Sequence, residues 1–86
     1  MRAVFTATGW SDYTYWQQVD RAQLERINKL IEAILRDPFD GIGKPEQLRH
    51  GLSGAWSRRI SEERRLVYVV KGDDVIIFQA RYHYEK

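Results

Sequence analysis

The chain has 86 residues, a formal net charge of +2 and no cysteine, which excludes a disulfide scaffold, an iron–sulfur cluster, a thiol nucleophile and a cysteine zinc site. Its composition, 43% hydrophobic and 30% charged, is typical of a folded globular protein, and its length predicts a single domain over residues 1–86. The longest apolar run, residues 66–70, is too short for a membrane helix, and the N-terminus lacks the features of a signal peptide. We therefore expect a cytoplasmic protein with no membrane segment.

The N-terminal half predicts one strand and two helices. Residues 2–6 form a β-branched and aromatic run typical of a strand. Residues 10–19 carry aromatic side chains at helical spacing, with Thr8 or Ser11 as the expected N-cap. A second helix should begin at the capping residue Asp20 and end before Pro38. Its apolar stripe consists of Leu24, Ile27, Leu30, Ile31, Ile34 and Leu35.

The C-terminal half predicts a long loop and three strands. Residues 39–54 contain four of the six glycines and show no sustained periodicity, as is typical of an ordered loop. Strand-like runs follow over residues 55–61, 64–70 and 75–82, with turns between them. The fold class is therefore α+β, with an N-terminal strand and a helical hairpin packed on an antiparallel sheet. Arg65 is expected at a strand end, where its side chain can reach into a cleft.

Basic residues are concentrated in the second half of the chain. Residues 1–43 carry a net charge of −1 and residues 44–86 carry +3. The cluster suits phosphate binding, because a phosphate responds to the local field, but arginines also protect exposed sheet edges against pairing. Both interpretations remain open at this point. The clustered residues are Lys44, Arg49, Arg58, Arg59, Arg64 and Arg65.

Most standard catalytic motifs are absent. Residues 41–44 read GIGK, but Pro45 follows where a phosphate loop needs Ser or Thr. The histidines His50 and His83 are too few and too distant in the chain to predict a metal site. We expect neither a metal nor another cofactor.

A dispersed set of residues could support metal-free RNA cleavage. Such chemistry needs a carboxylate to deprotonate a ribose 2′-hydroxyl, a guanidinium to stabilise the phosphorane and a histidine to protonate the leaving oxygen. Each of these residues is also an ordinary surface residue in many proteins. Trp56 could stack a base, but a tryptophan at the start of a strand more often anchors the core. From the residues alone, the chain is a nucleic-acid binder or a ribonuclease. The set comprises Glu46, Arg49, Arg59, Arg65, His83 and Tyr84.

Longer sequence blocks carry a family resemblance. Residues 38–48 read PFDGIGKPEQL and residues 52–60 read LSGAWSRRI. The blocks WSDY at 10–13, RLVY at 65–68 and RYHY at 81–84 complete the pattern. Together they resemble the YoeB, or Txe, toxins of the RelE/ParE superfamily over nearly the whole chain.

The resemblance implies a toxin that enters the ribosomal A site and cuts mRNA there. It implies that Glu46 is the general base, His83 the general acid, Arg65 the group that stabilises the transition state and Tyr84 the residue that orients the substrate. A metal-independent endoribonuclease of this kind leaves a 2′,3′-cyclic phosphate.

The resemblance also implies RNA-binding residues and partners. Lys44 and Arg59 are expected to hold RNA, and Arg49 replaces a lysine common in the family, which keeps the charge but changes the geometry. The implied partners are a YefM or Axe-type antitoxin, the ribosome, mRNA and a second copy of the chain. Two other interpretations stay open: a non-catalytic toxin like the ParE branch that poisons DNA gyrase, and a structural ribosomal-RNA-binding domain.

Overall fold

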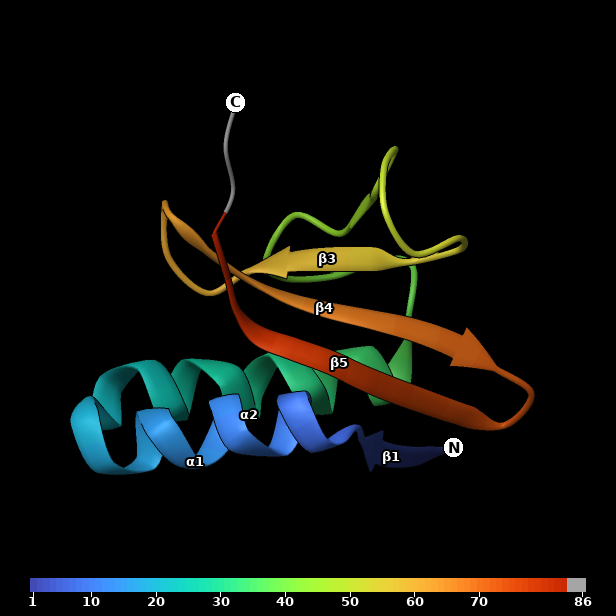
Figure 1. Ribbon diagram of the computed structural model, residues 1–86. Coiled ribbons are helices and arrows are strands. Elements are labelled where there is room, and N and C mark those ends of the chain that lie inside the picture. Colours follow the sequence, from blue (N-terminus) through green and yellow to red (C-terminus); the bar gives the residue numbers. More distant parts are fainter. Residues whose placement is uncertain (84–86) are drawn as a thin grey trace.

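Two helices cover one face of a five-stranded sheet in the computed structural model, which describes residues 1–83 (Figure 1). The helices are α1 (Ala7–Val19) and α2 (Arg21–Arg36). The strands are β1 (Arg2–Phe5), β2 (Glu46–Gln47), β3 (Trp56–Arg59), β4 (Arg64–Lys71) and β5 (Asp74–His83), in the sheet order β1-β5-β4-β3-β2. The α+β class is confirmed.

The sheet is mixed, which corrects the expected antiparallel arrangement. Strands β2 to β5 pair antiparallel, but β1 joins the sheet parallel to β5, with Arg2 opposite Asp74 and Phe5 opposite Ile77. The helical hairpin leads the chain away from β1, which lies beside the last strand (Figure 1). The loop expected over residues 39–54 also contains β2, a two-residue edge strand too short to give a periodic signal.

Helix α1 begins earlier in the chain than the aromatic spacing predicts. Its N-cap is Thr6, whose hydroxyl accepts a hydrogen bond from the Gly9 amide at 3.0 Å, and the expected caps Thr8 and Ser11 lie inside the helix. Gly9 is buried against β5, where a Cβ would overlap the carbonyl oxygen of Ile77. A glycine in the first turn is therefore required by close helix–strand packing.

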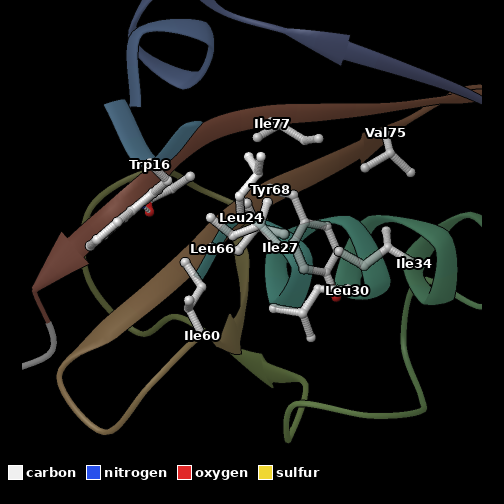
Figure 2. Packing of buried hydrophobic residues seen from close by; sticks show 11 residues of the cluster. Trp16, Leu24, Ile27, Leu30, Ile34, Ile60, Leu66, Tyr68, Val75 and Ile77 are labelled. Carbon is white, nitrogen blue, oxygen red and sulfur yellow. Dashed lines mark hydrogen bonds between the residues drawn. The ribbon is translucent and has the colours of Figure 1, made fainter. Parts of the chain in front are cut away.

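Helix α2 follows the prediction closely. Asp20 caps it by accepting hydrogen bonds from the amides of residues 22 and 23, and it ends at Arg36, two residues before Pro38. Ile27, Leu30 and Ile34 are completely buried in the core, where Figure 2 shows Tyr68 of β4 beside them. Burying one such side chain contributes about 1.5–3 kcal/mol, so the α2 stripe supplies much of the fold's stability.

Candidate functional site

Strand alternation places Arg59 and Arg65 on the sheet face that points away from the helices, here called the open face. Leu66 and Tyr68 pack in the core, so their neighbours on β4 point to the opposite side. Arg59 of β3 lies directly opposite Arg65 of β4. Tyr82 of β5 pairs with Arg65 from the other neighbouring strand, so it continues the same row across the open face.

Arg65 and Glu46, both predicted as catalytic, come together in the structure. The Arg65 side chain is 1% exposed, and its Nη1 lies 3.4 Å from Oε2 of Glu46 and 3.3 Å from Oγ of Ser57. Glu46 is 50% exposed and lies on β2, opposite Ser57 of β3. A guanidinium held by the protein therefore faces a carboxylate that solvent or a substrate can reach.

Arg59 and Arg65 form a cationic pair on neighbouring strands. Like charges directly opposite each other in a sheet repel, and an anion that lies between them relieves that repulsion. The Arg59 Nε is buried without a hydrogen-bond partner in the described part of the chain. A phosphate group has the charge and the acceptor oxygens to bind the Arg59 guanidinium.

The end of β5 is tied to α1 and carries His83. Bulges shift the β4–β5 register near Leu66 and leave Ala80 outside the pairing. The Asp12 carboxylate accepts from the Ala80 amide at 3.0 Å, and the Trp16 indole donates to the Ala80 carbonyl at 2.7 Å. His83 is exposed at the strand end and is the cross-strand partner of Arg64, so regular alternation turns it away from the row that contains Arg65 and Tyr82. Tyr84 lies outside the described residues.

Lys44 and Arg49 flank Glu46 along the edge of the sheet. Both are exposed, and Lys44 has a left-handed backbone with φ +50°. The loop is fixed to β3 because the Gly43 carbonyl accepts from the Arg59 amide at 2.7 Å. Within residues 1–83, the predicted site residues Lys44, Glu46 and Arg49 thus lie on β2 or beside it. The others lie on the strands: Arg59 on β3, Arg65 on β4 and His83 on β5.

Arg58 is a structural residue, which corrects its assignment to the phosphate-attracting cluster. Its guanidinium is completely buried on the helix side and donates to the carbonyls of Asp37, Asp40 and Ile42 at 2.6–3.1 Å. Its Nε donates to the Tyr68 hydroxyl at 3.1 Å, and that hydroxyl donates to the Pro38 carbonyl at 2.6 Å. This Arg58–Tyr68 lock holds the start of the loop that leads to Lys44 and Glu46.

Ser57 contributes to the site through its contact with Arg65, although the sequence prediction assigned it no role. Trp56 packs against the core, so strict alternation along β3 sends Arg58 to the same side and Ser57 to the open face. Adjacent arginines at positions 58 and 59 therefore have opposite roles.

No group of three or more metal-ligating side chains occurs within residues 1–83. In the same part of the chain, neither helix has the length and apolar character needed to cross a bilayer.

The family model described as "YoeB-like toxin of bacterial type II toxin-antitoxin system" matches residues 5–84. The chain belongs to the YoeB toxin family. It is therefore a toxin of a toxin–antitoxin system. It is 55% identical to the toxin YoeB of Synechocystis sp. over 86 residues, which is the full length of both chains.

Solved YoeB structures share the fold along almost the entire chain. A YoeB/ParE toxin from Agrobacterium tumefaciens is 45% identical, with a TM-score of 0.92 over 98% of this chain and 100% of that one. A YoeB dimer from Staphylococcus aureus is 41% identical, with a TM-score of 0.90 over 98% of each chain. YoeB in a YoeB–YefM complex from the same organism is 41% identical, with a TM-score of 0.86 over 95% of each chain.

Proposed function

We propose that this YoeB-family toxin is an endoribonuclease that cleaves mRNA in the ribosomal A site and so blocks translation. The observation that carries the proposal is the contact between the buried Arg65 guanidinium and the accessible Glu46 carboxylate at 3.4 Å. These two groups supply a base and a fixed cation on one open face, next to the strand end that bears His83.

The reaction is a transesterification within one ribose–phosphate unit. Glu46 takes the proton of the 2′-hydroxyl, whose oxygen attacks the adjacent phosphorus. Arg65 stabilises the added charge of the pentavalent phosphorane, because it is already desolvated and aimed at the site. His83 donates a proton to the departing 5′-oxygen, which leaves a 2′,3′-cyclic phosphate and a 5′-hydroxyl. DNA lacks the attacking hydroxyl, so the mechanism selects RNA.

Other residues on the same side hold the RNA strand. Arg59 shares the phosphate with Arg65, and Lys44 and Arg49 bind flanking phosphates from the exposed edge around β2. Tyr84, which follows His83 in the chain, orients the scissile phosphate. This assignment needs no metal or other cofactor.

The toxin is proposed to work in the cytoplasm, where ribosomes are, and to be neutralised by a YefM-type antitoxin. The YoeB–YefM complex and the YoeB dimer from Staphylococcus aureus support both an antitoxin partner and self-association for this chain. An acidic antitoxin segment that folds on binding would complement the cationic open face.

The test compares Glu46→Gln and His83→Gln with the control Glu25→Gln, which changes an exposed residue of α2. Ribosomes programmed with a defined mRNA are treated with each protein, and the ends of the RNA products are mapped. Loss of a general base or acid should slow cleavage about 10²–10⁴-fold, while the control cuts normally. Products should carry a cyclic phosphate and a 5′-hydroxyl.

The competing interpretations give different results. A non-catalytic gyrase poison would arrest growth with DNA breaks and no mRNA cleavage, and a structural RNA-binding domain would be harmless on expression. Unchanged cleavage by both catalytic variants, or products with 3′-hydroxyl ends, would exclude the proposed mechanism.

A further inference from the structure

Two side chains of α1 bind both backbone groups of a single residue in β5, Ala80. The Ala80 amide donates to Oδ2 of Asp12 at 3.0 Å, and the Ala80 carbonyl accepts from Nε1 of Trp16 at 2.7 Å. Asp12 and Trp16 are four residues apart and are therefore neighbours on one face of the helix. Because the donor and the acceptor of Ala80 are both held, this arrangement, here called the Ala80 clamp, fixes the residue in position and in orientation.

The Ala80 clamp lies where β5 departs from regular pairing. Between two regular pairs, Leu66 of β4 faces two residues of β5, Ala80 and Arg81. A bulge of this kind disrupts the ladder, and here side chains of α1 bind the completely buried Ala80. The next residue contacts α1 as well, since the guanidinium carbon of Arg81 lies 3.5 Å from the centroid of the Tyr15 ring in a cation–π contact. Helix α1 therefore helps to determine the course of the last residues of β5.

The strand reaches the proposed reaction centre two residues after the clamp. Tyr82 pairs with Arg65, and the exposed His83 follows it. At about 3.4 Å per residue, His83 lies only about 10 Å along the strand from Ala80. Since so few residues separate the two, a displacement of Ala80 moves His83 by a similar amount.

The proposed proton transfer depends on where His83 lies. When the bond between phosphorus and the 5′-oxygen breaks, its electron pair goes to the oxygen, which takes a proton from the imidazolium of His83. The nitrogen and the oxygen must be about 2.6–3.2 Å apart for this step. A misplacement of about 1 Å can slow an enzymatic reaction by about 100-fold.

We propose that Asp12 and Trp16 are positioning residues for the general acid His83. Both lie on the helix side of the sheet and act through the backbone of Ala80. Alternation turns His83 away from the row that contains Arg65, so the backbone after Ala80 has to turn before the imidazole reaches the open face. The clamp holds the start of this short segment, which brings the imidazole to a defined distance from the leaving oxygen. The inference rests on the proposed ribonuclease function.

The experiment measures kcat and KM for cleavage of a defined mRNA on ribosomes by the full-length chain. Asp12→Ala removes the acceptor and should lower kcat by about 10–100-fold with KM nearly unchanged, because the residues that bind RNA are intact. Asp12→Asn keeps an acceptor oxygen and should recover most of the rate. Tyr13→Phe is the matched control, since it breaks a hydrogen bond from the same helix to Asn28 of α2 instead of β5, and its kcat should equal that of the unmodified protein.

A second message separates positioning from a general loss of active protein. In this message, sulfur replaces the 5′-oxygen at the cleaved bond, and a thiolate leaves without a proton because thiols are far stronger acids than alcohols. Asp12→Ala and His83→Gln should therefore cut it nearly as fast as the unmodified protein. Trp16→Phe, which removes the indole donor and keeps an aromatic ring, should behave in the same way. Glu46→Gln should stay slow on both messages, because the 2′-hydroxyl still has to be deprotonated.

The outcomes separate the two proposals. Failure of the unmodified protein to cut either message would reject the ribonuclease function itself. Normal cutting of the oxygen message by Asp12→Ala and Trp16→Phe would overturn the positioning role alone, and so would equal slowing on both messages, which indicates a structural role only. If sulfur did not rescue His83→Gln, His83 would not be the acid, and the inference would fall although cleavage stands. If Asp12→Ala does not fold, as thermal unfolding would reveal, Trp16→Phe decides by the same comparison.

Discussion

Replacing Tyr68 with phenylalanine tests whether the Arg58–Tyr68 lock holds the loop that carries the proposed base. The substitution removes one oxygen atom and leaves the completely buried ring in place. That oxygen accepts from Arg58 Nε at 3.1 Å and donates to the Pro38 carbonyl at 2.6 Å. The change therefore breaks both bonds and leaves two polar groups without their partner.

The expected loss of stability follows from those two groups. An unsatisfied buried polar group costs about 1–3 kcal/mol, and a bond to a charged donor is at the upper end of the range. Because Arg58 keeps its three carbonyl acceptors, we expect a total of about 2–3 kcal/mol. In a domain of this size each kcal/mol lowers the melting temperature by about 4–8 °C, so the shift should be roughly 10–20 °C.

Tyr13→Phe is the matched control because it makes the same chemical change. The Tyr13 hydroxyl donates to Oδ1 of Asn28 at 2.7 Å in a half-buried position. Loss of this neutral bond should cost only about 0.5–1.5 kcal/mol. Urea and thermal unfolding at one fixed protein concentration would measure both variants. If Tyr68→Phe lost no more stability than Tyr13→Phe, the lock would not hold the loop as argued.

Three further changes test other parts of the structure. Burial raises the pKa of Tyr68. Above the unfolded pKa of about 10 the unfolded state therefore loses its proton first, and the free energy of unfolding should fall by up to about 1.4 kcal/mol per pH unit. Tyr68→Phe should reduce this trend in unfolding measurements between about pH 9 and 11. The hydrogen bonds and charge of Arg2 lower the pKa of Asp74. This pair should therefore stabilise the fold above the unfolded pKa of about 3.9, and the effect should be lost as the pH falls through the lower pKa of the folded state. Asp74→Asn should make the free energy of unfolding less dependent on pH in the acid range. Gly9→Ala should destabilise the fold by about 1–3 kcal/mol in urea unfolding, because its Cβ would overlap the Ile77 carbonyl and push α1 from β5; unchanged stability would contradict that packing.

Local signals in the sequence predicted the secondary structure better than the pairing between distant strands. The cap at Asp20 and the apolar stripe of α2 determine that helix within a few residues, so its start and end could be predicted. The parallel pairing of β1 with β5 depends on partners about 72 positions apart, such as Arg2 and Asp74, and no local pattern encodes it. The start of α1 was predicted too late because the aromatic spacing begins only at Trp10, whereas the helix packs Gly9 of its first turn on β5.

The candidate site was predicted in its residue types more than in its geometry. Alternation on β4 separates Arg65 from Leu66, and the structure places Arg65 beside Glu46. The bulges that place Ala80 against Asp12 and Trp16 have no signal in the sequence, since both faces of β5 are partly apolar. Charge alone also could not separate Arg58 from Arg59, because a count of basic residues ignores the side of the strand on which each lies.

The adjacent arginines of β3 link the stability of the fold to its chemistry. Arg58 points to the helix side and holds the carbonyls of Asp37, Asp40 and Ile42, while Arg59 points to the open face and faces Arg65. The loop that Arg58 holds continues directly to β2, where Glu46 meets the Arg65 guanidinium. Since the bonds of Arg58 hold the loop that leads to β2, a change that loosens the Arg58–Tyr68 lock should move Glu46 away from Arg65 before the sheet itself unfolds.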